Sequence, residues 1–501
     1  MDTLQNLLGG FSLALSPENL TFAFIGSFIG TLLGVLPGVG SAAGMAILLP
    51  LTFQMPTTSA IIMLAAIFYG SNYGGTITSV LMNVPGEAST IITCLDGHQM
   101  AKKGRAGAAL CIAAIGSFVG GTTAVVLLVI AAPPLAAVVV QFGPSEYFSL
   151  MVLGLSMFVV LAGKSVMKAL LVGVLGLILA TVGTDPASAV PRLTLGQLEL
   201  EDGLAFIPVI MGVFGIGDIL LNAEAELTQV FESKMGSMMP TRREVMDSIW
   251  PMIRGTGIGC FLGLIPGLGS AVSTFVSYAV EKKMSKYPED FGTGVIEGVA
   301  GPETANNAHC DAALIPLLTM GIPTGPTIAI LMGAFIMNGL TPGPLLFRDN
   351  PDVVWTIIAS FYVGNVMLLI LNLPLVGLWV KILKVPYSVL FALILVFAFV
   401  GAYSLDNSVF DIRIMSVFGV VGYFLKKLDF PLAPFALTFI LGPRMELGLR
   451  QSLVLFRGDV TQFFIHPVSA TLLTLALLIL LSPALRILAS RAKAANGPLP
   501  G

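Results

Sequence analysis

Two copies of a short proline-glycine motif are the residues of this sequence best placed to do chemistry. The segments Gly34-Val-Leu-Pro-Gly-Val-Gly-Ser-Ala42 and Gly263-Leu-Ile-Pro-Gly-Leu-Gly-Ser-Ala271 share six of nine residues. Proline lacks an N–H and glycine allows positive φ, so Pro-Gly inside an apolar stretch interrupts a helix. The restarting helix offers N–H groups that favour anions, and the preceding carbonyls favour small cations. The candidate binding residues here are Gly38, Gly40, Ser41, Gly267, Gly269 and Ser270.

A second group consists of polar residues inside otherwise apolar segments, at 69–76 and 301–311 and beside Pro85 and Pro323. Neutral amides and hydroxyls suit sodium coordination or hydrogen bonds to a carboxylated solute. An ionisable residue within a membrane span is a functional candidate by default. The candidates are Asn72, Gly86, Glu87, Glu303, Asn306, Asn307, Pro323 and Thr324. A sodium ion is expected near Ser41, Asn72, Ser270 and Asn306.

Each candidate also has a structural interpretation. Glycines allow close packing of membrane helices, amides and hydroxyls join helices by hydrogen bonds, and carboxylates at an aqueous mouth balance a helix dipole. The duplicated Pro-Gly motifs favour the site interpretation, because a helix break in lipid requires polar partners. Three consecutive residues on a helix do not converge on one metal ion, so His309, Cys310 and Asp311 predict polar packing.

Composition indicates the solvent in which these residues work. Charged residues make up 11% of the 501 residues, apolar residues 55%, and the mean hydropathy is +0.92. A soluble core cannot hide so much apolar surface behind so few charges. The net charge of −3 does not indicate nucleic acid as a partner, and the four cysteines show no metal-binding or disulfide spacing. The sequence therefore predicts an all-α polytopic membrane protein.

The duplicated motifs divide the chain into two repeats. The Pro-Gly motifs are offset by 229 residues, and Met82-Asn-Val-Pro85 and Met320-Gly-Ile-Pro323 by 238. We expect roughly 11 full crossings plus two re-entrant hairpins. The predicted parts are a first repeat at 1–221 with a hairpin at 20–54 and a broken segment at 57–101, a polar cytoplasmic connector at 222–247, a second repeat at 248–450 with a hairpin at 248–280 and a broken segment at 292–346, and a C-terminal helix and tail at 451–501.

The basic residues predict that the two repeats have inverted topology. Lys102-Lys103-Gly-Arg105 falls in a loop whose second-half counterpart is acidic, whereas Lys282-Lys283 falls where the first half carries no basic residue. Because Lys and Arg accumulate in short cytoplasmic loops, equivalent loops lie on opposite sides of the membrane. Arg444, Arg450 and Arg457 fall on the predicted outer side, where we expect a surface or partner contact.

The motifs together resemble those of the large membrane subunit of the tripartite tricarboxylate transporters, the TctA family. The resemblance runs over essentially the full chain and departs from the family pattern at Thr324, where the family suggests glycine after Ile-Pro. The motifs that carry it are the two Pro-Gly-x-Gly-Ser segments, Tyr69-Gly-Ser-Asn-Tyr-Gly-Gly, Asn83-Val-Pro-Gly-Glu87, Gly298-Val-Ala-Gly-Pro-Glu-Thr-Ala-Asn-Asn307 and Gly321-Ile-Pro-Thr-Gly325.

This resemblance implies a secondary transporter in the bacterial inner membrane. It implies two protein partners, a small TctB-like membrane subunit and a TctC-like periplasmic solute-binding protein that delivers a carboxylate such as citrate. It implies symport driven by a cation gradient, with sodium ahead of protons, and no other cofactor. Analogy with other transporters built from inverted repeats and hairpins suggests an elevator-like movement.

Other function classes stay open to different degrees. One alternative is a stand-alone permease for another organic anion, and a second is a passive channel, since mirrored broken helices also suit a pore. Enzymatic signals fail: Ala162-Gly-Lys-Ser165 ends like a P-loop but has Phe158 where the first glycine is needed. No nucleophile, base and orienting acid stand at a recognisable spacing, so we do not expect an enzyme.

Inverted topology predicts the same membrane side for two basic loops. Single cysteines introduced beside Lys103 and beside Lys283 should both react with a membrane-impermeant maleimide from the cytoplasmic face only. Labelling of the two positions from opposite faces would exclude the inverted repeat.

Overall fold

The computed structural model describes residues 3–36, 40–157, 165–185, 188–224, 237–382 and 387–495, almost entirely as helices. The chain forms two compact units, each built from two separate stretches. Unit 1 consists of residues 1–140 and 205–428, and unit 2 consists of residues 141–204 and 429–501. Each unit therefore contains a piece from either side of the polar segment at 222–247. The predicted repeat boundaries remain a prediction.

Unit 1 begins with six α-helices and two short 3₁₀ helices. These are α1 (Thr3–Ala14), α2 (Pro17–Val35), α3 (Gly40–Leu48), the 3₁₀ helix Leu49–Gln54, α4 (Thr57–Met82), the 3₁₀ helix Ala88–Thr90, α5 (Thr93–Lys102) and α6 (Ala106–Val139). Its second stretch contains α9 (Phe206–Ile210), a π-helical turn (Met211–Ile216), α10 (Gly217–Glu224), α11 (Arg242–Gly263), α12 (Ser270–Met284), the 3₁₀ helix Pro288–Asp290, α13 (Glu297–Ala312), α14 (Leu314–Met320), α15 (Pro326–Met337), α16 (Pro344–Asp349), α17 (Pro351–Asn372), α18 (Val376–Ile382), α19 (Tyr387–Asp406) and α20 (Val409–Lys427).

Unit 2 is smaller and contains the one sheet of the described residues. Its elements are α7 (Pro144–Ser156), α8 (Val166–Leu179), β1 (Gly183–Thr184), β2 (Pro191–Arg192), the 3₁₀ helix Leu198–Leu200, α21 (Leu432–Leu455), α22 (Gln462–Ile465) and α23 (Pro467–Ala495). The two strands pair antiparallel, Gly183 opposite Arg192. Helix α21 packs against both α7 and α8.

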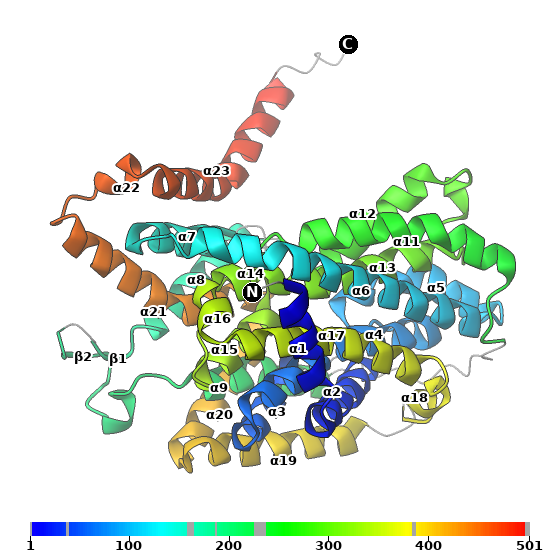
Figure 1. Ribbon diagram of the computed structural model, residues 1–501, viewed down its shortest axis with the longest axis horizontal. Coiled ribbons are helices and arrows are strands. Elements are labelled where there is room, and N and C mark those ends of the chain that lie inside the picture. Colours follow the sequence, from blue (N-terminus) through cyan, green and yellow to red (C-terminus); the bar gives the residue numbers. More distant parts are fainter. Residues whose placement is uncertain are drawn as a thin grey trace. The chain divides into compact units, whose positions relative to one another are not determined.

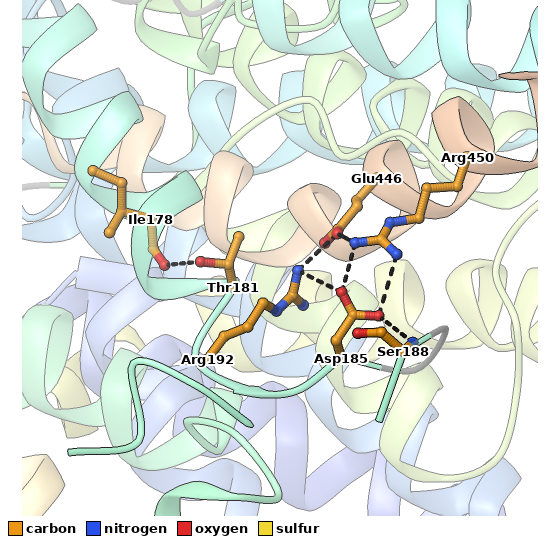
Figure 2. Close-up of polar contacts among 7 residues, drawn as sticks. All are labelled: Ile178, Thr181, Asp185, Ser188, Arg192, Glu446 and Arg450. Atoms are coloured by element: carbon orange, nitrogen blue, oxygen red, sulfur yellow. Dashed lines mark hydrogen bonds and ion pairs between the residues drawn. The ribbon is translucent and has the colours of Figure 1, made fainter. Parts of the chain in front are cut away.

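Four ion-paired side chains hold the hairpin of unit 2 to α21 (Figure 2). Arg450 donates to Asp185 at 2.6 Å and to Glu446 at 2.7 Å, and Arg192 donates to the same Glu446 at 2.7 Å. Asp185 also accepts the Ser188 N–H at 3.0 Å. Arg450, which the charge pattern places on the wrong side, is thus bound within unit 2.

Membrane-spanning character is clear for part of the chain. Six helices of the described residues are long and apolar enough to cross a membrane, and further apolar helices are shorter. The six are Pro17–Val35, Thr57–Met82, Ala106–Val139, Phe206–Glu224, Pro351–Asn372 and Leu432–Leu455. The protein is therefore an all-α, multi-pass membrane protein. The expected number of crossings and the inverted orientation remain predictions.

The same element order occurs in each half of unit 1. Helix α2 stops at Val35 and α3 starts at Gly40, while α11 stops at Gly263 and α12 starts at Ser270. In each half a wholly buried helix follows, α4 in the first and α13 in the second. Each buried helix packs against the helix that precedes the break, as α11 and α13 show (Figure 1).

Glycine rows make this packing backbone against backbone. On α2, Gly26, Gly30 and Gly34 face α4, and a Cβ at Gly30 would lie 2.5 Å from the Ile67 carbonyl oxygen. On α11, the corresponding row is Gly255, Gly259 and Gly263, offset by the same 229 residues and facing α13. Small residues at intervals of four allow such approach between membrane helices. The spacing is visible in the sequence, but its meaning as a packing face appears only in the structure.

Substitutions on α11 test this packing. A Cβ at Gly259 would lie 2.4 Å from the Ala305 carbonyl oxygen, whereas a Cβ at Gly257 meets nothing within 4 Å. We expect Gly259→Ala to lower the free energy of unfolding by about 1–3 kcal/mol, because the helices must separate. Gly257→Ala, on the same helix, should be neutral or slightly stabilising. Thermal unfolding of both variants in detergent measures the difference, and equal midpoints would contradict the backbone contact.

Candidate functional site

A cavity of about 280 Å³ in unit 1 brings the interruptions of both halves together. Its wall is formed by four short segments and six single residues. They are 40–43, 87–89, 268–271 and 324–328, with Phe68, Phe214, Asp218, His309, Ala313 and Lys426. Six predicted site residues line it, namely Gly40, Ser41, Glu87, Gly269, Ser270 and Thr324. The helices α3, α12 and α15 all begin at this cavity.

In the first half, an internal carboxylate lies at the start of α3. The Ser41 N–H donates to Glu87 Oε1, and Ser71 Oγ donates to the same oxygen at 2.7 Å. Gly40 adopts φ +61°, which turns the chain into the helix. Asn83 ends α4 at φ 58°, in the left-handed region. Glu87 therefore occupies the position at which the sequence predicts a bound carboxylate.

Gly86 owes its importance to the absence of a side chain. A Cβ there would lie 2.1 Å from the Gly34 carbonyl oxygen and 2.6 Å from the Gly75 Cα. The loop that carries Glu87 can therefore lie directly against α2 and α4. This role is in packing and brings the neighbouring carboxylate to α3.

In the second half, no acidic side chain takes the corresponding position. The Gly267 N–H donates to the Thr324 carbonyl at 3.0 Å, and Gly267 adopts φ +85°. Neither α12 nor α15 has a side-chain hydrogen bond at its N-cap, which is Gly269 in α12 and Gly325 in α15. Their first N–H groups are therefore available at the cavity wall. Pro323 lies in the buried loop before α15.

One side-chain contact joins the two halves across this region. Ser41 Oγ lies 3.1 Å from Thr327 Oγ1, although 286 residues separate them in the chain. Ser41 therefore connects the start of α3 to the start of α15. Gly38 lies outside the described residues.

The structure adds a cation that the motifs lack. Lys426, in the last turn of α20, lines the cavity and forms an ion pair with Asp218 of α10. The adjacent Lys427 does not line it and bonds instead to Glu224 at 2.9 Å. Sequence reasoning placed both lysines in a basic loop. The signal that was available is the position of Lys426 within the helical run of α20, one residue closer to the apolar segment.

Asn72 and Glu303 do not line the cavity. Asn72 donates to the Phe68 carbonyl at 2.9 Å and accepts from Ser89 at 3.1 Å. Glu303 accepts from Thr76 at 2.6 Å and also from Thr93. Both form contacts within the bundle, as the structural interpretation predicts.

The remaining two predicted residues, Asn306 and Asn307, also lie in the core and not at the cavity. Asn307 donates to Ser117 at 2.7 Å, a link between α13 and α6. Asn306 is 0% exposed, and neither polar atom of its side chain has a hydrogen-bond partner. A buried amide without partners is costly, so this side chain is a candidate for a further ligand.

The comparison with known families decides what kind of protein carries this cavity. The family described as "Tripartite tricarboxylate transporter TctA family" matches residues 20–437. The chain belongs to the TctA family. That family is one of transporters and not of enzymes, and the match includes every residue that lines the cavity.

Two relatives from Agrobacterium vitis extend this comparison. The chain is 47% identical over 490 residues to an uncharacterized 52.8 kDa protein in the TAR-I ttuC' 3' region, which covers 97% of this TctA chain and 98% of that protein. It is 50% identical over 219 residues to an uncharacterized protein in the TAR-II ttuC' 3' region, which covers 44% of this chain and 90% of that protein. No solved structure matches the chain.

The link between Glu87 and α3 predicts a stability effect. Glu87→Ala removes the acceptor of the Ser41 N–H and of Ser71, so the free energy of unfolding should fall by about 1–3 kcal/mol. Glu87→Gln keeps an oxygen in place and should cost less. The exposed Glu289→Ala is the control. Thermal unfolding measures all three, and an unchanged midpoint for Glu87→Ala would show that this carboxylate does not hold the two segments together.

Proposed function

We propose that this TctA protein is the large permease subunit of a binding-protein-dependent secondary transporter in the bacterial inner membrane. It imports carboxylate solutes of the tricarboxylate and dicarboxylate type and is driven by a cation gradient, with sodium as the first candidate and the proton as the second. A TctB-like membrane subunit and a TctC-like periplasmic binding protein complete the system. Family membership and the multi-pass fold support this assignment.

The observation that carries the proposal is the composition of the cavity wall. The open N-termini of α12 and α15 meet there beside Lys426. Helix N-termini carry partial positive charge and unpaired N–H donors, which suit a carboxylate. An ammonium group close to two such helix starts adds a full positive charge. A solute with two or more carboxylates therefore finds several separate donors in one enclosed space.

Lys426 begins the cycle paired with Asp218, so a solute carboxylate has to take over this contact. Exchange of one carboxylate for another costs less than exposing a bare ammonium group, because the charge stays paired throughout. The same logic applies to α3, where Glu87 already holds the Ser41 N–H. We therefore assign solute binding to the second-half helix starts and Lys426, with Glu87 as a fixed internal anion.

An elevator-like movement is consistent with the division of the chain. All residues that line the cavity belong to unit 1. A site contained in one rigid body can move as a whole, whereas a site shared between two bodies would come apart. We propose unit 1 as the moving part and unit 2 as the anchor.

Neutralising Lys426 tests the proposed site. Solute affinity of the purified subunit is measured by calorimetry with citrate and with a series of dicarboxylates and monocarboxylates. We expect Lys426→Gln to weaken binding of multiply charged solutes about tenfold or more, since one charged contact is lost. Lys427→Gln, which removes the same charge one residue away, should bind like the wild type. Equal affinities for the two variants would contradict the site.

Uptake into proteoliposomes then separates the proposed transporter from its alternatives. With the other two components supplied, we expect accumulation against a gradient only when a cation gradient is imposed. Accumulation without the binding protein would support a stand-alone permease. Equilibration without accumulation would support a passive channel.

A further inference from the structure

Helix α13 carries two buried carboxylates that the cavity does not use. Glu303 is 1% exposed and Asp311 is 2% exposed. Their spacing of eight residues, with Asn307 between them, places all three on one face of the helix. Among the described residues, no Lys, Arg or His forms an ion pair with either carboxylate. A buried ionised carboxylate needs a counter-charge or a set of donors.

The two carboxylates differ in what surrounds them. Glu303 has a hydroxyl donor for each oxygen, from Thr76 and Thr93. Asp311 accepts a single hydrogen bond from Asn365 of α17, and this bond is long at 3.3 Å. Asp311 is therefore the less compensated carboxylate of the pair.

The space beside Asp311 is kept open by a glycine. A Cβ at Gly121 of α6 would lie 2.8 Å from Asp311 Oδ2 and 3.1 Å from Asn365 Oδ1. A single atom in that space would therefore contact oxygens from both α13 and α17. Any side chain at position 121 would fill the space, so glycine preserves a cradle bounded by two oxygen donors.

A third oxygen donor reaches the same region from α4. The Tyr73 side chain is 3% exposed, and its hydroxyl has no hydrogen-bond partner. The charge that acts on it most strongly is that of Asp311, followed by that of Glu303. A buried hydroxyl without a partner beside an undercompensated carboxylate indicates that a further atom belongs between them.

We propose that Asp311, Asn365 and Tyr73 form a binding site for a sodium ion in the core of unit 1. All three donors are oxygens, which hard cations prefer. A single carboxylate with neutral partners matches a cation of charge +1. The site lies deeper than the four positions expected from the sequence and uses none of them.

The position on α13 suggests how this ion acts on the solute site. His309 and Ala313, two residues before and after Asp311, line the solute cavity. Residues two apart on a helix point to opposite sides, so the ion and the cavity share one turn of α13 from opposite faces. An ion that fixes Asp311, Asn365 and Tyr73 fixes the turn that forms part of the cavity wall. This coupling role rests on the proposed function, whereas ion binding itself does not.

Thermal unfolding of the purified subunit without solute or partners tests the site. The midpoint is compared in sodium chloride and choline chloride at equal ionic strength and constant pH. We expect sodium to raise the midpoint of the wild type by several degrees, because a ligand bound only to the native state stabilises it. Asp311→Asn should unfold cooperatively in both salts and lose the difference between them. Asp411→Asn, the same change at a buried carboxylate of α20, should keep it.

Tyr73→Phe separates an ion ligand from a structural residue. It removes a hydroxyl that makes no protein hydrogen bond, so the midpoint in choline chloride should not fall. The sodium concentration for half-maximal stabilisation should rise about tenfold, as expected for one lost contact to a charge. The same concentration in wild type and Tyr73→Phe would remove Tyr73 from the site.

Three results would overturn the inference. These are no sodium-dependent rise in the wild type, a rise retained in Asp311→Asn, or an equal rise with potassium chloride. None of these measurements involves a carboxylate solute. The sodium site can therefore fail while solute binding at Lys426 stands, and the reverse also holds.

Discussion

The close contact of backbones along two glycine rows is the constraint on which the rest of the structure depends. Gly26, Gly30 and Gly34 bring α2 onto α4, and an equivalent row brings α11 onto α13. Each row ends at the glycine that opens a Pro-Gly motif, Gly34 in the first half and Gly263 in the second. The packing register therefore determines where the chain breaks. Without this register the starts of α3 and α12 would not meet at one cavity.

The two halves use the same architecture for different chemistry. In the first half Glu87 bonds to the start of α3 and supplies a permanent negative charge. In the second half the loop of Thr324 supplies a backbone carbonyl, and the start of α12 has no side-chain cap. A carboxylate solute would be repelled by the first arrangement and attracted by the second. This asymmetry is the physical basis for assigning solute binding to the second half.

The wholly buried helices of unit 1 are also its most polar ones. Helices α4 and α13 carry tyrosines, threonines, asparagines and carboxylates, and many of these face one another across the bundle. Apolar helices would pack equally well, so polarity at this cost indicates a role. One face of α13 borders the solute cavity and the other carries Asp311. The helix is thus the shortest physical connection between an anion site and a cation site.

Membrane character, the helix breaks and the duplication could all be determined from the sequence, because hydropathy, proline and glycine act locally and repeats are visible as text. The same holds for membership of the TctA family, which the motifs carry in order. Six predicted site residues, Ser41 and Glu87 among them, do line the cavity. The sequence could not show that Asn72, Glu303, Asn306 and Asn307 lie elsewhere, nor that Lys426 joins the site. Those placements depend on which helix faces which across hundreds of residues, and only the tertiary packing of the glycine rows decides that.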